Sequence, residues 1–269
     1  MIFRLVAVAL LALTSAACGS PPAPPAPAAP GVPPGIELTP TGTMTVAAPA
    51  AVLDRMRVTG AITVAAPDVV IRRSVFEGDG SEPWAIRTEG EGSVTIEQVT
   101  IRGGYTDAGI AGNNWTARGV EIVGASSDGA KLGDHVRVTG SWFHDFQPIE
   151  GGHIDGLQAD EAYGDIVIED NRIEVGTGEG SNAAIMLSPD VTPERRQVGP
   201  VIVRRNVLGG GGYTVYNVEG NTGKALADVT IADNEFQPGA QYGPVYPRGV
   251  RPKIYERNRF TDGTPVHWP

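Results

Sequence analysis

A short pattern of apolar and polar positions recurs along most of this chain. In its clearest copies, residues 166–173 and 201–208, apolar residues lie five and three positions before an asparagine and two positions after it. Because this alternation has period two and Gly, Asn, Asp and Pro lie between the copies, each copy predicts a strand, a turn and a second strand. The aligned turn positions are Ser74, Val99, Val120, Ser141, Asn171, Asn206, Asn234 and Asn258.

The spacing of these copies indicates a repeat architecture. Successive copies are 21 to 35 residues apart, and no stretch after residue 36 keeps the apolar period of a helix for three turns. A unit this short cannot bury its own apolar side, so the units must stack. The sequence therefore predicts an all-β, single-stranded right-handed parallel β-helix of about eight coils, spaced about 4.8 Å apart. The four asparagines are expected to form a hydrogen-bonded ladder and to take the left-handed backbone of the bend.

Composition supports this fold and excludes some classes of binding partner. The 269 residues include 36 glycines and only 6% aromatic residues, which suits short strands joined by turns. The net charge of −10 repels phosphate backbones, so we expect no nucleic-acid partner. It also disfavours polyanionic polysaccharides unless cations bridge the two. The single cysteine excludes a disulfide framework.

The N-terminus predicts export. Residues 1–17 contain Arg4, an apolar run over 5–13 and small residues before Cys18, which is the pattern of a signal peptide. The apolar run is too short to span a bilayer. Cys18 resembles the cysteine of a bacterial lipobox, which is lipidated and becomes the mature N-terminus. The alternative is ordinary secretion after cleavage behind Ala17.

A tether separates this signal from the folded domain. Residues 18–35 are rich in proline and alanine and are expected to stay extended as polyproline II. The β-helix domain is predicted to occupy residues 36–269. We expect it to be a monomer that meets a membrane only through a lipid anchor.

A second strand follows each turn, and its outward positions predict the site. These strands are expected at 84–87, 108–111, 129–132, 155–158, 183–186 and 213–216, with Ile86, Ile110, Leu132, Leu157, Ile185 and Val215 facing inward. The outward row then holds Arg87, Ala111, Lys131, Gln158, Met186 and Tyr216. Because His, Asp, Gln, Asn and Tyr gather on the central coils, we expect the functional site on the outer face there.

Three short segments carry a family resemblance: residues 153–158 (HIDGLQ), 171–173 (NRI) and 211–214 (GGYT). With these motifs, roughly residues 60–260 resemble secreted bacterial right-handed parallel β-helix proteins of the pectate-lyase-like superfamily. That superfamily includes lyases, hydrolases, transferases and inactive binding proteins. The resemblance therefore implies the fold and leaves the reaction open.

The catalytic candidates are His153, Asp155 and Lys131. His153 and Asp155 lie two residues apart on one strand, so their side chains share a face and either cooperate in proton transfer or bind a cation. Alternatively, Asp155 only stabilises a turn before Gly156, and Lys131 is only a solvated charge.

The substrate-binding candidates are polar and aromatic residues expected to face solvent. Gln158 and Asn182 are either ladder residues or partners of sugar hydroxyls. The tyrosines either close the core or stack on a sugar, and Trp142 occupies an outward slot that charged residues hold in other coils. The complete set is Arg87, Trp142, Gln158, Asn182, Tyr213 and Tyr216.

Two classes of function follow. The first is an enzyme acting on an extracellular or cell-wall polysaccharide. As a lyase it would use Lys131 or His153 as base, and Arg87 or a calcium ion held by Glu150, Asp155 and Asp160 would neutralise the substrate. As a glycoside hydrolase it would need two carboxylates flanking the bond. The second class is a non-catalytic glycan-binding protein or envelope surface lipoprotein. Calcium is the only cofactor that the residues suggest.

Overall fold

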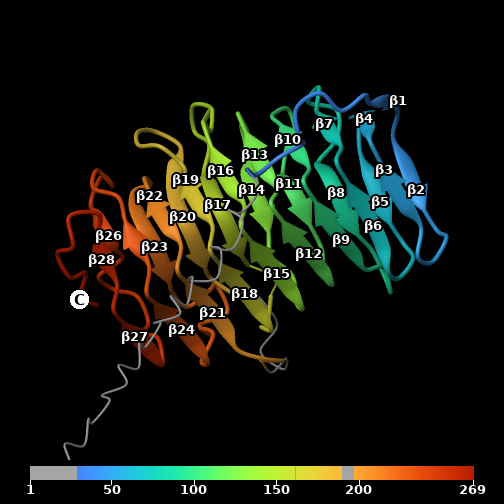
Figure 1. Ribbon diagram of the computed structural model, residues 1–269. Helices are drawn as coiled ribbons and strands as arrows, with labels where there is room; N and C mark the ends of the chain where they lie inside the picture. Colours follow the sequence, from blue (N-terminus) through green and yellow to red (C-terminus); the bar gives the residue numbers. More distant parts are fainter. Residues whose placement is uncertain (1–28, 161, 190–196) are drawn as a thin grey trace, which may run out of the picture.

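Three parallel sheets wind into a right-handed β-helix of about nine coils (Figure 1). The structure is a computed structural model that describes residues 29–160, 162–189 and 197–269. Within these ranges the chain forms strands and turns and no helix. The fold predicted from the repeat is thereby confirmed, with one coil more than expected. The proposed signal peptide, Cys18 and residues 18–28 of the tether lie outside the described residues.

Each coil contributes one strand to each sheet, and every strand pairs in parallel with its counterparts on the neighbouring coils. The first sheet consists of β1 (Thr39–Thr41), β4 (Met56–Thr59), β7 (Val75–Glu77), β10 (Thr100–Arg102), β13 (Glu121–Val123), β16 (Trp142–His144), β19 (Arg172–Glu174), β22 (Val207–Gly209), β25 (Glu235–Phe236) and β28 (Arg259–Phe260).

The second sheet carries the candidate site. It consists of β2 (Met44–Val46), β5 (Ile62–Val64), β8 (Trp84–Thr88), β11 (Ala108–Ala111), β14 (Asp128–Lys131), β17 (Ile154–Ala159), β20 (Ser181–Leu187), β23 (Tyr213–Asn217) and β26 (Gly243–Val245). The third sheet consists of β3 (Val52–Asp54), β6 (Val69–Arg72), β9 (Val94–Glu97), β12 (Trp115–Arg118), β15 (Val136–Thr139), β18 (Ile166–Glu169), β21 (Val201–Arg204), β24 (Val229–Ala232) and β27 (Ile254–Glu256).

The apolar positions of the repeat form a continuous interior column. The residue two places after each turn position lies in the first sheet in register with its counterparts, and nearly all of these side chains are fully buried. The column contains Phe76, Ile101, Ile122, Phe143, Ile173, Leu208, Phe236 and the partly buried Phe260. Burial of this column across coils is what makes the short strands stable together.

The asparagine ladder is present, with one correction. Asn206 Nδ2 donates to Asn234 Oδ1 at 3.0 Å, while Asn206 Oδ1 accepts the backbone N–H of Asn171 at 3.0 Å. The left-handed backbone expected at the asparagines instead lies one residue earlier, at Asp170, Arg205, Asp233 and Arg257. The bend thus falls on an exposed residue, and the buried asparagine turns its amide inward to bond the next coil.

The strand predicted over 129–132 is displaced by one residue. β14 covers Asp128–Lys131, and Ala130 pairs with Ile110 and Leu157. Leu132 is therefore not the inward counterpart of these residues, although it is also buried. Ala130 and Leu132 are both apolar and both buried, so the apolar pattern does not distinguish the two possible registers of this strand.

Residues near the start of the described chain lie on the outside of the coils. Gly31 N–H donates to Gly119 O at 2.9 Å, and Val32 N–H donates to Thr100 Oγ1 at 3.0 Å. Contact between the chain and the domain therefore begins before Ile36. From this point the segment reaches β1 at one end of the solenoid (Figure 1).

The strands of the second sheet have two positions, three residues apart, whose side chains point away from the core, although Ala108, Asp128, Asp155 and Ala183 at the first of them are buried. Between them lie two buried positions: a Cβ added to Gly156 would lie 2.4 Å from Ile173 Cγ2 in the core, and Leu157 is fully buried. On β8 the two outward side chains are Trp84 and Arg87, and Arg87 Cζ lies 4.0 Å from the centroid of the Trp84 ring. We call the two outer rows the aspartate row (Trp84, Ala108, Asp128, Asp155, Ala183, Tyr213) and the lysine row (Arg87, Ala111, Lys131, Gln158, Met186, Tyr216).

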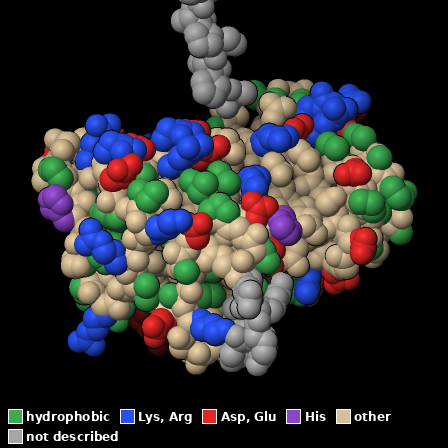
Figure 2. Space-filling view, turned by 90° about the horizontal axis from the view of Figure 1, so that it is seen from below, with side chains coloured by type: hydrophobic (Ala, Val, Ile, Leu, Met, Phe, Trp, Pro, Cys, Tyr) green, Lys and Arg blue, Asp and Glu red, His purple; other side chains and the backbone are tan. Residues whose placement is uncertain are grey.

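Ion pairs across neighbouring coils cover other outer surfaces. In the third sheet, Arg118 pairs with Glu97 at 3.2 Å and Arg204 pairs with Glu169 at 2.7 Å. Figure 2 shows a face on which Lys and Arg side chains lie interspersed with Asp and Glu. A surface of this kind supports solubility and is not a single-sign binding patch.

Candidate functional site

The lysine row assembles as the sequence predicted. Lys131 pairs with Gln158, Gln158 with Met186, and Met186 with Tyr216, each on the next coil of the second sheet. Side chains from segments far apart in the chain therefore lie one strand spacing apart, about 4.8 Å.

Asp155 lies at the centre of the aspartate row and is fully buried by its neighbours. Its Oδ1 accepts a hydrogen bond from Asn182 Nδ2 at 2.7 Å, and its own backbone N–H donates to Asp128 Oδ1 at 2.8 Å. Its Oδ2 has no hydrogen-bond partner among the described residues, and His153 Nδ1 lies 3.9 Å away from it. A buried carboxylate without a partner is unfavourable, so this oxygen favours either a proton or an approaching cation.

Burial raises the pKa of Asp155 well above its usual value, and the neighbouring charge of Asp128 adds to this shift. Burial also raises the pKa of Asp128 to about 7, against the opposing effects of the Asp155 backbone N–H and Lys131. Two adjacent coils thus place two carboxyl groups where both cannot readily ionise at neutral pH. Their titrations are coupled.

A stability measurement tests this picture of Asp128. Its raised pKa means that between about pH 4 and pH 7 the unfolded chain loses this proton while the folded chain keeps it. The free energy of unfolding should therefore fall as pH rises through this window, by at most roughly 1.4 kcal/mol per pH unit from this group. We expect Asp128→Asn, which cannot ionise, to reduce that slope in denaturant titrations. An unchanged slope would contradict the assignment.

Lys131 is held as a cation. Its Nζ lies 2.8 Å from Asp107 Oδ1 and 3.7 Å from Asp160 Oδ2, and the side chain is half-buried. Burial alone would lower the pKa of Lys131, but the hydrogen bond to Asp107 and the charges of Asp160, Asp107 and Asp128 outweigh it and raise the pKa. A lysine that holds its proton this firmly is better suited to balancing negative charge than to acting as a base.

His153 opens onto a cavity of about 430 Å³. Its side chain is 63% exposed, in contrast to the fully buried Asp155 behind it. Burial raises the pKa of Tyr216, which keeps its hydroxyl protonated at the same cavity. The lining consists of Gly152, His153, Gly178, Glu179, Gly180, Ser181, Asn182, Gly212, Tyr216, Gln241 and Tyr242. The cavity thus combines one exposed imidazole with hydroxyl and amide groups.

Four tyrosines lie beside this cavity and form what we call the tyrosine cluster: Tyr213, Tyr216, Tyr242 and Tyr246. Tyr213 contacts the other three, with ring centroids 5.3 to 5.6 Å apart, and Tyr216 stacks on Tyr246 at 4.9 Å. Tyr242 is 65% exposed. Exposed tyrosine rings suit the apolar faces of sugars.

Two predicted site residues lie elsewhere. Arg87 is on β8, three strands from Asp155 and about 14 Å away at the usual strand spacing, and it also approaches Glu89 at 3.7 Å. Trp142 is on β16 of the first sheet, where its ring stacks on His144 at 3.6 Å and its Nε1 donates to Glu174 at 3.1 Å. Neither is brought together with His153 and Asp155.

The metal candidates are not gathered around one point. Asp155 is buried against Asn182, Asp160 faces Lys131 and Glu150 is exposed. Across residues 29–160, 162–189 and 197–269, no group of three or more His, Cys, Asp or Glu side chains could hold a metal ion. Calcium binding by Glu150, Asp155 and Asp160 stays a prediction from the sequence.

Several residues of the site were missed by the sequence analysis. Asp128 has a signal, because the Asp-Gly pair at 128–129 recurs one coil later at 155–156. Asp134, which lies near it in the sequence, instead accepts the backbone N–H groups of Tyr163 and Gly164. Tyr242 and Tyr246 flank the short strand β26 and follow no outward spacing that a pattern could reveal.

Comparison with known protein families, curated proteins and solved structures finds no match for this chain. The fold therefore defines the class: the protein is a right-handed parallel β-helix with ionisable side chains gathered on the outer face of one sheet. In the part of the chain that the structure describes, there is no helix with the length and apolar character needed to cross a membrane.

Proposed function

We propose that this protein cleaves a uronate-containing polysaccharide by β-elimination, with His153 as the base. The observation that supports this most directly is the pairing of an exposed imidazole with a buried carboxyl oxygen. His153 Nδ1 faces Asp155 Oδ2 at 3.9 Å, and that oxygen has no other partner among the described residues. A small movement of the imidazole would bring the two groups within hydrogen-bond distance.

In this reaction His153 removes the proton from the carbon next to the uronate carboxylate. The electron pair released forms a carbon–carbon double bond, and the bond to the glycosidic oxygen on the adjacent carbon breaks. Tyr216 lines the same cavity and donates its hydroxyl proton to the leaving oxygen. Asn182 and Gln241 offer amide N–H groups to the negative charge that develops on the carboxylate.

Asp155 and Asn182 support His153 without contacting the reacting carbon. The imidazolium formed on His153 supplies the positive partner that Asp155 lacks, which stabilises the proton on the imidazole. Asn182 holds the carboxyl group in place through its 2.7 Å hydrogen bond. Lys131 contributes a fixed positive charge one coil away, between Asp107 and Asp160.

Hydrolysis has less support from the geometry. Retaining hydrolases place two accessible carboxyl groups about 5 Å apart. Asp128 and Asp155 lie on adjacent coils, but their exposures are 6% and 0%. The exposed carboxylate at the cavity is Glu179, which has no second exposed carboxylate beside it in the cavity lining.

Non-catalytic glycan binding is the second candidate, and the tyrosine cluster favours it. Aromatic rings that bind sugar faces require no reacting group nearby.

We also propose that the protein acts outside the cytoplasm, because the sequence of residues 1–17 predicts an export signal.

A substrate panel tests these alternatives. The purified protein is incubated with uronate polymers and with neutral wall polysaccharides, with and without EDTA. Unsaturated products are followed by ultraviolet absorbance and new chain ends by a reducing-sugar assay. We expect both signals on a uronate polymer. New ends without unsaturation would replace the lyase by a hydrolase, and retention on a glycan without product would replace it by a binding protein.

A further inference from the structure

We infer that the outer face of the second sheet holds a second sugar subsite, in which Arg248 binds the carboxylate of a uronate whose ring lies on Tyr216 and Tyr246. This inference rests on the proposed function for its substrate class. It assigns a specificity role to Arg248 and Tyr246, which neither the repeat pattern nor the cavity of His153 identifies.

A separate cavity of about 520 Å³ defines this subsite. Tyr216 lines both this cavity and the cavity of His153, so the two adjoin across one side chain. The lining of the second cavity consists of Met186, Tyr216, Val218, Glu219, Tyr246, Arg248 and Val250. A polymer that reaches His153 can therefore continue past Tyr216, along the strand direction of β20 and β23, into this space.

The tyrosines give the subsite an apolar surface of fixed orientation. The Tyr216 and Tyr246 rings stack with centroids 4.9 Å apart and planes 24° apart. Tyr213 meets both rings edge-on, at 5.6 Å and 5.3 Å. Because three rings hold one another, their orientation is set before a ligand arrives, and a pyranose face can pack on them without reordering.

Arg248 gives the subsite its charge preference. Its side chain is exposed, and none of the described carboxylates lies within ion-pair distance of it. By contrast, Arg204, Arg205 and Arg257 are each paired with Asp or Glu side chains. An unpaired guanidinium at the rim of an aromatic cavity can bind a carboxylate through two parallel hydrogen bonds.

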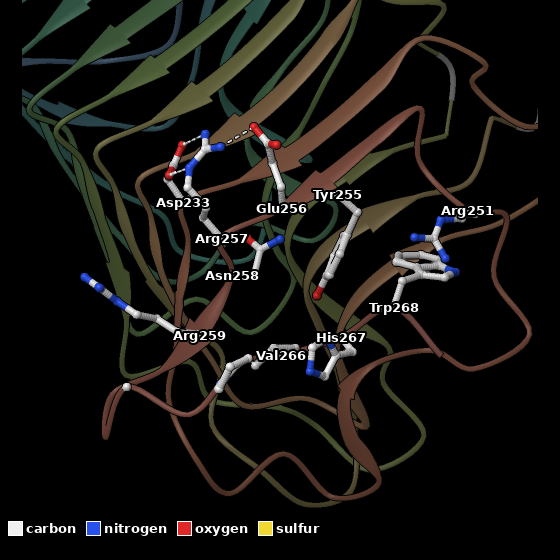
Figure 3. A pocket seen from close by; sticks show the side chains of 12 residues that line it. Asp233, Arg251, Tyr255, Glu256, Arg257, Asn258, Arg259, Val266, His267 and Trp268 are labelled. Carbon is white, nitrogen blue, oxygen red and sulfur yellow. Dashed lines mark hydrogen bonds and ion pairs between the residues drawn. The ribbon is translucent and has the colours of Figure 1, made fainter.

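A third cavity contains Arg251, which is exposed as Arg248 is but lies in a different part of the molecule. This cavity of about 500 Å³ lies at the C-terminal end of the solenoid and shares no lining residue with the other two. Figure 3 shows Arg251 beside Trp268 there, and Arg257 bonded to Asp233 and Glu256. Arg251 is exposed like Arg248 but lies off the path from His153, which makes it the matched control.

The test is equilibrium binding, which needs no turnover. Oligomers of galacturonate, mannuronate, guluronate and glucuronate are titrated by calorimetry, each beside its carboxyl-reduced neutral form, using the His153→Ala variant. We expect Arg248→Gln to weaken binding of the preferred uronate roughly tenfold or more and to leave its neutral form unchanged. Arg251→Gln should change neither. Tyr246→Leu should weaken both forms, and Tyr246→Phe should preserve both.

The outcomes separate this inference from the proposed reaction. Arg248-dependent binding without any cleavage by the unmutated protein would leave the subsite standing and remove the lyase. Cleavage that proceeds with the same KM in Arg248→Gln would overturn the subsite and leave the lyase. Failure to bind any of the four uronates, or equal losses for the charged and neutral forms in Arg248→Gln, would also overturn it. Circular dichroism of each variant checks that the coils remain folded.

Discussion

Replacing His153 by alanine is expected to lower cleavage of the uronate polymer about 10²- to 10⁴-fold while the coils stay folded. The rate should fall because the cavity loses its base. The fold should persist because the side chain is 63% exposed and lies directly before β17. The measurement is kcat on the polymer identified by the panel, together with an unfolding curve. His135→Ala is the matched control, since His135 is also exposed and bonds Asp165 away from the cavity.

Asp155→Asn separates a positioning role from a purely structural one. Because the pKa of Asp155 is raised, its ionised form, which stabilises an imidazolium, becomes populated only as pH rises well above the usual carboxyl range. The wild-type rate should therefore rise with pH over that range. The substituted amide cannot ionise, so the variant should lose that limb of the profile and much of kcat, with KM little changed. A variant with reduced activity but the wild-type pH profile would contradict this role.

The largest loss of stability is expected from Asn206→Ala. The Asn206 amide makes four hydrogen bonds of 2.9 to 3.0 Å, to Ile168 O, to Asn234 Oδ1, and from the backbone and side-chain N–H groups of Asn171. Removing it leaves several buried groups without partners, each worth about 1–3 kcal/mol, so the free energy of unfolding should fall by roughly 3 kcal/mol or more. Denaturant titration by circular dichroism measures this change.

Asn206→Ser provides the control for the ladder. Serines already hold equivalent positions at 74 and 141, where Ser74 Oγ accepts the Met56 N–H at 3.0 Å and Ser141 Oγ accepts the Val120 N–H at 3.1 Å. A serine at position 206 should therefore still accept the Asn171 N–H and lose less stability than alanine. Equal losses for serine and alanine would show that the side-chain amide, and not the bond to the preceding coil, carries the effect.

The sequence predicts the inward column well because each member is large, apolar and tied to a turn position at a fixed offset. It also predicts which outer residues stack, since Lys131, Gln158 and Met186 follow the same register. It also places Trp142 correctly in the outward slot that Glu121 and Arg172 hold on the neighbouring coils, although this slot lies on a different sheet from His153. Trp142 faces out, but from the first sheet.

The remaining misses have a common physical cause. Whether His153 opens to solvent while Asp155 is enclosed depends on the loops around residues 152 and 178–180, whose paths no periodicity encodes. The same holds for Tyr242, Tyr246 and Arg248, which lie around a three-residue strand. Burial then sets the acidity of Asp128 and Asp155, and burial is a property of the folded neighbourhood and not of the local sequence.

Within four consecutive residues, the strands of the second sheet alternate between positions that fill the interior and positions that point away from it. The middle two, such as Gly156 and Leu157, fill the interior, while the outer two, Asp155 and Gln158, belong to the outer rows. A designer could therefore exchange the partly exposed lysine-row residue, such as Gln158, without repacking the solenoid, whereas Asp155 is fully buried and bonded to Asn182. Natural variation would have the same freedom at the lysine row of each coil, so that binding preference can change there while the interior column is kept.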